Sequence, residues 1–191
     1  MATQNERSQA TRDALLSAAR RLFAERGYAE VSVGELAGLA GVTTGALYHQ
    51  FASKERLFEA VYDAVVKDVS ARIVDARESS ARPSVLADCQ IYLEACVDPA
   101  FHRIALVDGP AVMGWHRVLD TAQFMIEGAL AAAQSRGEIA DLPLAPLARM
   151  LAAAMKEAGT MIATSQDPQR ARAEATEGAR RLIGGLLTER E

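Results

Sequence analysis

The sequence predicts an all-α protein of about nine helices. Apolar residues recur three and four positions apart along almost the whole chain, which is the spacing of one face of a helix. Runs of β-branched residues are too short to compete with this pattern. Residues that cap helices are dense near the N-terminus, where three helix starts fall within about 25 residues. Together these observations predict a compact helical bundle followed by a second helical region.

The first two helices are delimited by glycine and by a capping motif. Apolar residues from Leu15 to Phe23 share one helical face, and Gly27 follows the last basic turn as a C-terminal stop. The segment from Ser32 to Glu35 has the spacing of a capping box. We therefore expect the first helix to end near residue 26 and a second, short helix to run from about 33 to 40.

Two further caps predict a third and a fourth helix. Thr43 is placed to cap a short helix over residues 44–50. Ser53 then caps a long helix whose apolar face extends from Phe58 to Ile73. At 1.5 Å per residue this helix reaches roughly 35 Å, so it leaves the N-terminal bundle and leads toward the rest of the chain.

The second region begins after a break at residues 78–84, which are rich in serine and contain a proline. Further breaks are expected at Asp98-Pro99, at Asp108-Gly109-Pro110 and in the loop from Gly137 to Pro146. The predicted domains are residues 1–60 and 61–191. The helices expected in the second domain cover residues 84–97, 100–107, 115–136, 144–165 and 169–188.

The composition is that of a globular chain. Half of the 191 residues are apolar, 24% are charged, and the net charge is −4. Wholly apolar runs are far shorter than the roughly 20 residues of a membrane helix, and the N-terminus has no signal-peptide apolar run. Cys89 and Cys96 are too far apart along a helix for a disulfide with each other. We therefore expect a cytoplasmic protein with no membrane partner.

The segment from residue 41 to 58 is typical of a helix-turn-helix. In that motif the second helix enters the major groove of DNA with its N-terminal residues at the base edges. Thr43 and Thr44 offer hydroxyl and methyl groups for such contacts, and Gly45 permits a close approach of the backbone. Tyr48 and His49 follow one turn later.

A family resemblance rests on two stretches, TRDALLSAARRLFAERGY and SVGELAGLAGVTTGALYHQFASKERLF. With them, residues 8–60 resemble the N-terminal domain of the tetracycline-repressor (TetR) family. Its members are dimeric, ligand-responsive transcription factors, usually repressors. The resemblance implies a homodimer that binds an inverted-repeat operator in double-stranded DNA and is released by a small molecule. It places the DNA-binding residues at Ser32, Val33, Thr43, Thr44, Gly45, Tyr48, His49 and Lys54.

Simpler roles remain open for several of these residues. Ser32 and Thr43 serve as helix caps whether or not they also contact DNA. Tyr48 as a packed aromatic and Lys54 as a solvated charge are the corresponding alternatives. Residues 1–60 carry seven basic and seven acidic side chains, so their net charge is zero. This balance predicts few neutralised phosphates and a modest dependence of DNA affinity on salt.

The effector is expected to be a small, largely apolar molecule bound between helices of residues 84–165. Such pockets are mostly apolar with a few placed polar groups. For each aromatic or thioether side chain in this region, ordinary core packing is the alternative role. The candidate ligand-binding residues are Phe101, Ile104, Met113, Trp115, His116, Phe124, Met125 and Met161.

The last two expected helices are apolar nearly all round, which predicts that they are buried on more than one side. We expect them to pair with their two-fold copies in a four-helix dimer interface. The candidate interface residues are Leu147, Leu151, Ala154, Ala158, Ile162, Leu182, Ile183 and Leu186.

No motif of an enzyme is present: the chain lacks G-x-S-x-G, H-E-x-x-H and a phosphate-binding glycine loop. Its cysteines and histidines do not have the short spacing of metal ligands. We therefore expect no catalytic activity, no metal and no cofactor. The alternative to a regulator is a helical ligand-binding or protein-interaction module without sequence-specific DNA binding.

Overall fold

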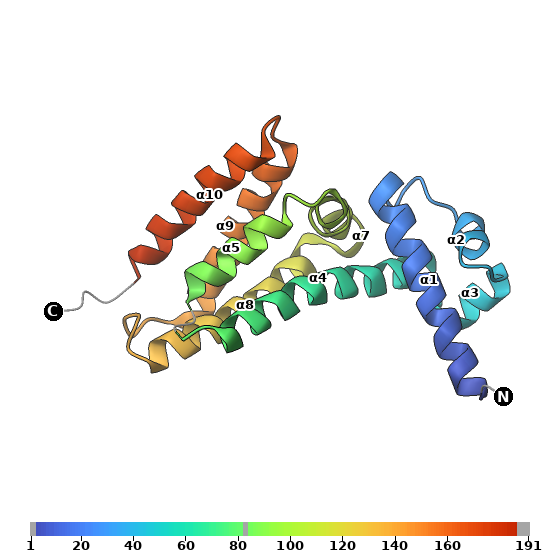
Figure 1. Ribbon diagram of the computed structural model, residues 1–191, viewed down its shortest axis with the longest axis horizontal. Helices are drawn as coiled ribbons and strands as arrows, with labels where there is room; N and C mark the ends of the chain where they lie inside the picture. Colours follow the sequence, from blue (N-terminus) through green and yellow to red (C-terminus); the bar gives the residue numbers. More distant parts are fainter. Residues whose placement is uncertain (1–2, 82–83, 187–191) are drawn as a thin grey trace.

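The computed structural model describes residues 3–81 and 84–186, and these residues form helices joined by short turns, with no β-strand among them (Figure 1). The predicted all-α class is confirmed. Two lobes are visible. The N-terminal lobe comprises the first three helices, and the C-terminal lobe comprises the helices that follow residue 84.

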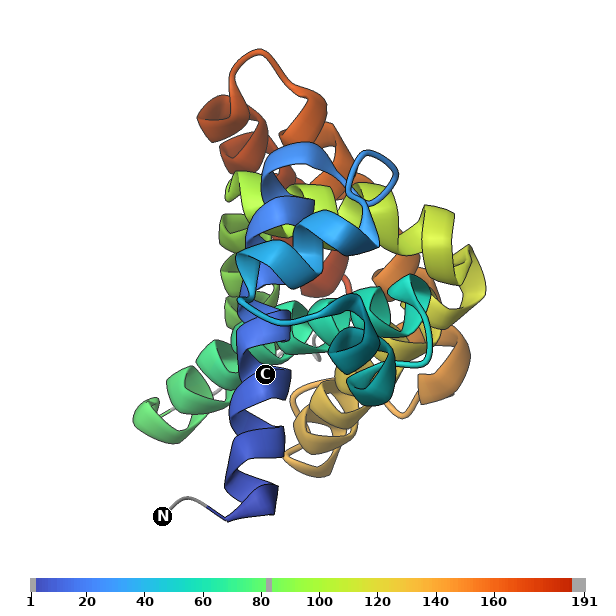
Figure 2. The same ribbon diagram turned by 90° about the vertical axis from the view of Figure 1, so that its right-hand side faces the viewer.

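The N-terminal lobe is built by α1 (Gln4–Arg26), α2 (Val33–Leu39) and α3 (Thr44–Gln50). α1 ends at Gly27, whose φ of +84° is readily adopted only by glycine. The three helices enclose a core that includes Phe23, and Figure 2 looks at the molecule from the end that carries α2 and α3.

A single long helix, α4 (Lys54–Ser79), joins the two lobes (Figure 1). It buries Phe58 against the N-terminal lobe and carries its apolar face on to Ile73 in the C-terminal lobe. It runs across the predicted domain boundary at residue 60, so the two predicted domains are connected by a helix and not by a loop.

The C-terminal lobe is built around α5 (Val85–Ala95), α8 (Trp115–Ser135), α9 (Leu144–Thr164) and α10 (Pro168–Gly184). α8 and α9 pack along each other, and α10 packs on α5 and α9. These helices lie within a few residues of the predicted ranges; residues 187 and 188 of the last predicted helix lie outside the described residues.

The helix between α5 and α8 differs from the prediction. It runs without a break from Pro99 to Met113 as α6 (Pro99–Phe101), the π-helical η1 (His102–Asp108) and α7 (Gly109–Met113). The predicted break at residues 108–110 is wrong, because the Gly109 N–H donates to the Ile104 carbonyl in the π-helical pattern and the helix continues through Pro110 into α7. The helix ends instead at Gly114, with φ +84°. Counting this run as one, the described chain has nine helices.

Candidate functional site

The short helix α3 presents an exposed polar face at the end of the N-terminal lobe. Its N-cap residue Thr43 accepts a hydrogen bond from the backbone N–H of Ala46 at 3.1 Å. Leu47 is fully buried and fixes the helix to the lobe, whereas the Tyr48 side chain is 53% exposed. The remaining candidate contacts on this helix, Thr44, Gly45 and His49, are also exposed. The structure therefore brings these five predicted DNA contacts together on one solvent-facing surface.

The N-terminus of the preceding helix, α2, is fixed by a capping box and an ion pair. Ser32 and Glu35 form the predicted capping box, and Arg26 at the end of α1 donates to the Glu35 carboxylate at 2.5 Å. These hydrogen bonds, that of Arg26 foremost, lower the pKa of Glu35 to about 2. Ser32 is exposed and Val33 is half-buried beside it, so α2 is fixed in place relative to α1 while its start remains open to solvent.

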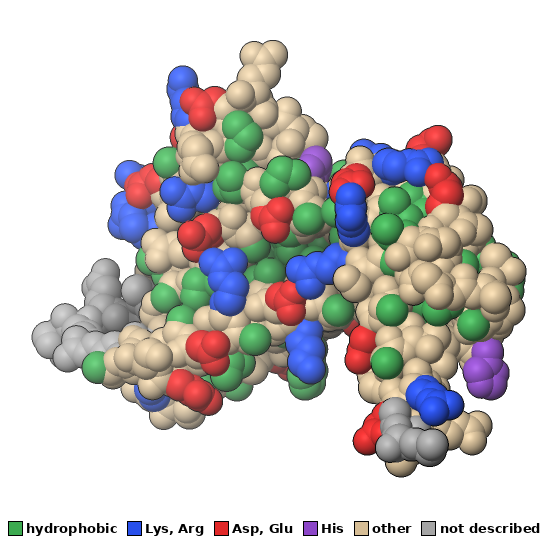
Figure 3. Space-filling model, turned by 45° about the vertical axis from the view of Figure 1, so that its right-hand side comes forward, with side chains coloured by type: hydrophobic (Ala, Val, Ile, Leu, Met, Phe, Trp, Pro, Cys, Tyr) green, Lys and Arg blue, Asp and Glu red, His purple; other side chains and the backbone are tan. Residues whose placement is uncertain are grey.

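The basic side chains of this lobe and of the start of α4 are mostly engaged within the protein. The arginines at positions 20, 21, 26 and 56 each pair with a carboxylate. Arg12 lies over the ring of Phe51 at 4.3 Å. The half-buried Lys54 places its ammonium over the ring of Tyr28 at 4.2 Å, and burial lowers the pKa of Lys54. In Figure 3 the face of the N-terminal lobe that is turned to the viewer is mostly uncharged, with charged groups toward its upper and lower edges.

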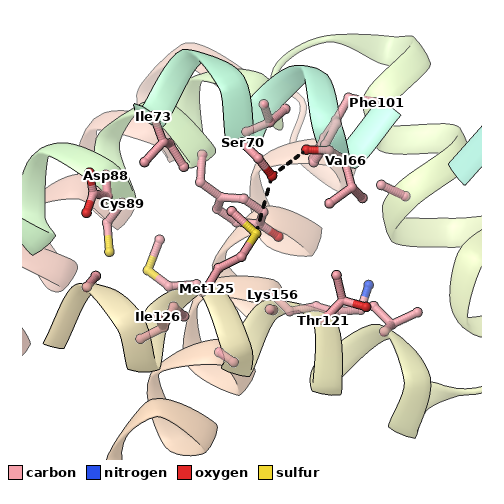
Figure 4. A pocket seen from close by; sticks show the side chains of 18 of the residues that line it. Val66, Ser70, Ile73, Asp88, Cys89, Phe101, Thr121, Met125, Ile126 and Lys156 are labelled. Carbon is pink, nitrogen blue, oxygen red and sulfur yellow. Dashed lines mark hydrogen bonds between the residues drawn. The ribbon is translucent and has the colours of Figure 1, made fainter. Parts of the chain in front are cut away.

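The C-terminal lobe has a partly open cavity of about 120 Å³ between α4, α5, α6, η1, α8 and α9 (Figure 4). Its walls are largely apolar, and the Ser70 hydroxyl donates to its own helix, at the carbonyl of Val66, at 2.8 Å. At one side Arg77 donates three hydrogen bonds to the Asp88 carboxylate, at 3.0, 3.1 and 2.5 Å. These features are typical of an internal binding pocket for a small apolar molecule.

Lys156 reaches into this cavity from α9 and is only 4% exposed. Its ammonium donates to the backbone carbonyl of Leu106 at 3.3 Å and lies 5.1 Å from the ring centroid of Trp115. Burial lowers the pKa of Lys156 to about 8, against smaller opposing effects of Cys96 and Glu157. The sequence analysis missed this residue, although a lone lysine within an alanine-rich apolar helix was a usable signal.

Of the eight predicted ligand-binding residues, Phe101 and Met125 line the cavity. Ile104 is fully buried in the core beside it, and Trp115 lies against Lys156. The others lie outside the lining because α8 and α9 turn them elsewhere: Phe124 is 82% exposed, Met161 is 61% exposed, and Met113 and His116 belong to the helix junction near Gly114.

The π-helical η1 connects the cavity to the N-terminal lobe. Ala105 and Leu106 line the cavity from one side of η1. From the other side, the Asp108 carboxylate accepts a hydrogen bond from the Tyr28 backbone N–H, and Arg103 donates to the Arg26 carbonyl at 3.0 Å. One short helical segment thus touches both the pocket and the turn between α1 and α2. The sequence analysis did not identify either contact.

The predicted dimer residues divide into three groups by their exposure. Leu151, Ile162 and Ile183 are buried inside their own protomer, because α9 and α10 turn these side chains toward the core. Leu182 is 60% exposed, and Ala154 is exposed as well. Leu147, Ala158 and Leu186 are half-buried.

Within residues 3–81 and 84–186, no group of three potential metal ligands lies together, and no helix is long and apolar enough to cross a membrane. Cys89 and Cys96 are buried free thiols, and burial raises the pKa of each to about 12. High thiol pKa values disfavour the thiolate, which is the form that binds metals.

Comparisons with known proteins agree with this arrangement. The family model described as bacterial regulatory proteins, tetR family, matches residues 15–61, and the tetracyclin repressor-like C-terminal domain matches residues 83–186. The Transposon Tn10 TetC protein of Escherichia coli is 32% identical over 60% of this chain and 59% of its own length. The HTH-type transcriptional repressor KstR2 of Mycobacterium tuberculosis is 39% identical over 38% of this chain and 36% of its own length. The chain therefore covers less than two thirds of the length of each of these two curated relatives.

The fold has a counterpart over its full length among solved structures. A TetR-family transcriptional regulator from Pectobacterium atrosepticum superposes with a TM-score of 0.84, at 28% sequence identity and 100% coverage of both chains. The helix-turn-helix region and the helical C-terminal lobe thus match domains of the same family. The chain belongs to the TetR family of bacterial regulatory proteins.

Proposed function

We propose that this protein is a homodimeric, ligand-responsive transcriptional repressor that binds an inverted-repeat operator through α3. The observation that carries the proposal is the exposed polar face of α3, where Thr44 and Tyr48 stand free of the lobe while Leu47 fixes the helix. A helix held in this way is suited to major-groove readout. The proposal assigns the protein no catalytic step and places it in the cytoplasm, where the DNA is.

The dimer is proposed to form through the outward faces of α9 and α10. Met150, Ala154 and Met161 lie at helical spacing on one side of α9, and Leu182 is exposed on α10. Exposed apolar side chains that share a face are typical of a protein interface. Two such faces related by a two-fold axis would form a four-helix interface and place two α3 helices on successive major grooves.

The effector is proposed to occupy the cavity of the C-terminal lobe. Occupation would act on η1, which lines the cavity with Leu106 and holds the turn after α1 through Asp108 and Arg103. A ligand that favours a different position of η1 shifts the population toward an arrangement in which the two α3 helices no longer fit the operator. By linkage, DNA weakens ligand binding by the same factor.

Selection from a randomised duplex library tests the DNA-binding role. Wild-type protein should enrich an inverted repeat, whereas the Thr44→Ala, Tyr48→Ala double variant should enrich none. Lys67→Ala, at an exposed position of α4 remote from α3, should enrich the same repeat as wild type. Folding and dimerisation of each protein are checked by circular dichroism and sedimentation. Failure of folded, dimeric wild type to enrich any sequence would reject the proposal in favour of a helical module without DNA recognition.

A further inference from the structure

Lys156 is the one buried charged residue among those the structure describes. Removal of an ammonium from water is costly unless good hydrogen bonds or a counter-charge compensate it. The ammonium has three N–H donors, and its hydrogen bond within the described chain is to the Leu106 carbonyl, at a long 3.3 Å. Trp115 adds a cation–π contact at 5.1 Å. These contacts leave much of the hydrogen-bonding capacity of the ammonium unused.

The cavity also lacks a negative charge for this ammonium. No carboxylate of the described residues lies within 4.0 Å of the Lys156 ammonium. Asp88, the acidic residue of the lining, already accepts three hydrogen bonds from Arg77. In Figure 4, Asp88 and Lys156 lie toward opposite sides of the pocket. Since the Arg77–Asp88 pair is neutral overall, the pocket carries one uncompensated positive charge.

The remaining lining residues indicate the chemical character of the rest of the ligand. Between the two charged regions the walls are largely apolar, with Val66 and Val69 from α4 and Met125 and Ile126 from α8 among the lining residues. Methionine and branched aliphatic side chains adapt to an alkyl chain or a ring without specific polar contacts. The pocket therefore combines one buried cation with an extended apolar surface.

We propose that the effector is an amphipathic acid, in which one carboxylate pairs with Lys156 and an apolar body occupies the cavity between α4 and α8. This inference rests on the proposed function and names the class of its effector. The carboxylate supplies the acceptors that the ammonium lacks, and this pairing in a water-poor site forms a charge-assisted hydrogen bond. The same ammonium also donates to the Leu106 carbonyl of η1, so an acid bound at Lys156 is one hydrogen bond away from η1.

The test compares octanoate with octanamide, which has nearly the same shape and no charge. Calorimetric titration of the full-length protein at pH 7 should give at least about 10-fold tighter binding of octanoate, as expected for a hydrogen bond to a charged partner. Fluorescence of Trp115, the only tryptophan, should change with octanoate because it lies beside the Lys156 ammonium. Hexanoate and decanoate, each with its amide, extend the comparison across chain length.

Two variants test whether the preference for the acid over the amide depends on Lys156. Lys156→Met keeps the length of the side chain and removes its charge, so the preference for the acid over the amide should fall to about one while the amide still binds. Lys67→Met makes the same change at an exposed position of α4 and should keep the wild-type preference. Circular dichroism confirms that both variants are folded.

Equal binding of acid and amide by wild type would overturn the proposal, as would a preference that survives in Lys156→Met or the absence of binding by every acid of the series. The duplex selection is scored separately. Acid binding at Lys156 without operator selection rejects the proposed function and leaves an acid-binding module. Operator selection without acid binding retains the repressor and rejects this effector class.

Discussion

The Asp108 carboxylate accepts a hydrogen bond from the backbone N–H of Tyr28 at 2.7 Å, and this bond connects the two lobes across 80 residues of sequence. Asp108 belongs to η1, and Tyr28 follows the glycine that ends α1. Arg103 reinforces the contact, since its guanidinium lies 3.8 Å from the same carboxylate and also donates to Arg26. In the proposed mechanism, these contacts would carry a displacement of η1 to the turn that precedes α2.

Replacement of the aspartate should weaken this junction. Asp108→Ala leaves the partly buried Tyr28 N–H without its acceptor, so the free energy of unfolding should fall by about 1–3 kcal/mol. Urea unfolding followed by circular dichroism measures the change. Asp63→Ala, at an exposed site on α4, is the matched control and should lie within about 0.5 kcal/mol of wild type. Equal stability of the two variants would mean that the contact contributes nothing.

A second prediction concerns the glycine at the end of α1. A Cβ at Gly27 would lie 2.3 Å from an Arg103 nitrogen, and its φ of +84° disfavours any side chain. Gly27→Ala should therefore lower the free energy of unfolding by roughly 1–3 kcal/mol. Gly38 in α2 has open space around it and a helical backbone, so Gly38→Ala should stabilise by up to about 1 kcal/mol. Thermal unfolding of both variants is the check, and opposite signs are expected.

The buried lysine gives the protein a pH dependence of known sign. The pKa of Lys156 is lowered from 10.5 to about 8 on folding, so between these values the unfolded chain binds more protons. Burial of this residue therefore lowers the free energy of unfolding most below pH 8, and by progressively less as the pH rises toward 10.5. Lys156→Met should gain stability over wild type at pH 7, and this gain should shrink by roughly 3 kcal/mol by pH 10.5.

Urea unfolding of both proteins across this pH range measures that difference. The other titrating side chains are present in both proteins. Cys96 interacts with Lys156, but burial raises the pKa of its thiol to about 12, so this thiol stays protonated in the folded protein up to pH 10.5. A stability difference that stays constant from pH 7 to pH 10.5 would contradict the lowered pKa.

The proposed dimer face is tested by one charged substitution. Met161 is 61% exposed on α9, and Met161→Glu places a charge where two protomers would meet, so sedimentation should show a monomer at concentrations where wild type is dimeric. Val74, 47% exposed on α4, supplies the control, and Val74→Glu should remain a dimer. A dimeric Met161→Glu protein would place the interface elsewhere.

The salt dependence of operator binding should be modest. Most arginines of the N-terminal lobe pair with carboxylates, so few are free to neutralise phosphates. The slope of log K against log salt, obtained by fluorescence anisotropy with the selected duplex, reports that number. A slope that corresponds to about ten neutralised phosphates per dimer would refute this expectation.

The helices of the N-terminal lobe were predictable because their signals are local. Ser32 and Thr43 cap the helices that follow them, as their spacing predicts, and Gly27 ends α1. A cap acts through backbone groups two or three residues away, so the sequence contains both partners of the interaction. Because Thr43 fixes where α3 begins, the helical period then determines which of its residues face solvent.

The pocket was less predictable because its lining depends on how distant helices turn toward one another. Phe124 and Met125 are adjacent in sequence, yet one is 82% exposed and the other lines the cavity. The type of side chain does not distinguish them. Lys156 has a similar explanation: a lysine is ordinarily solvated, and although its apolar helical surroundings were a signal, its contact with Leu106 depends on a residue 50 positions away in the sequence.

The same limit applies to the break expected at residues 108–110. Gly109 and Pro110 are common turn residues, but a Cβ at Gly109 would lie 2.8 Å from the Tyr62 ring. This glycine is required for close packing against α4 and not for a turn. Local composition cannot separate these two uses of glycine.

The position of η1 has a practical consequence for redesign as a biosensor. In the proposed mechanism, effector recognition and signal transmission would reside on different residues of one seven-residue segment, with Leu106 toward the cavity and Asp108 toward the turn after α1. Cavity residues on α4 and α8 could then be exchanged for those that fit a new analyte while the output connection is left intact. Conversely, changes at Arg103 or Asp108 would tune the strength of the response without altering which analyte is detected.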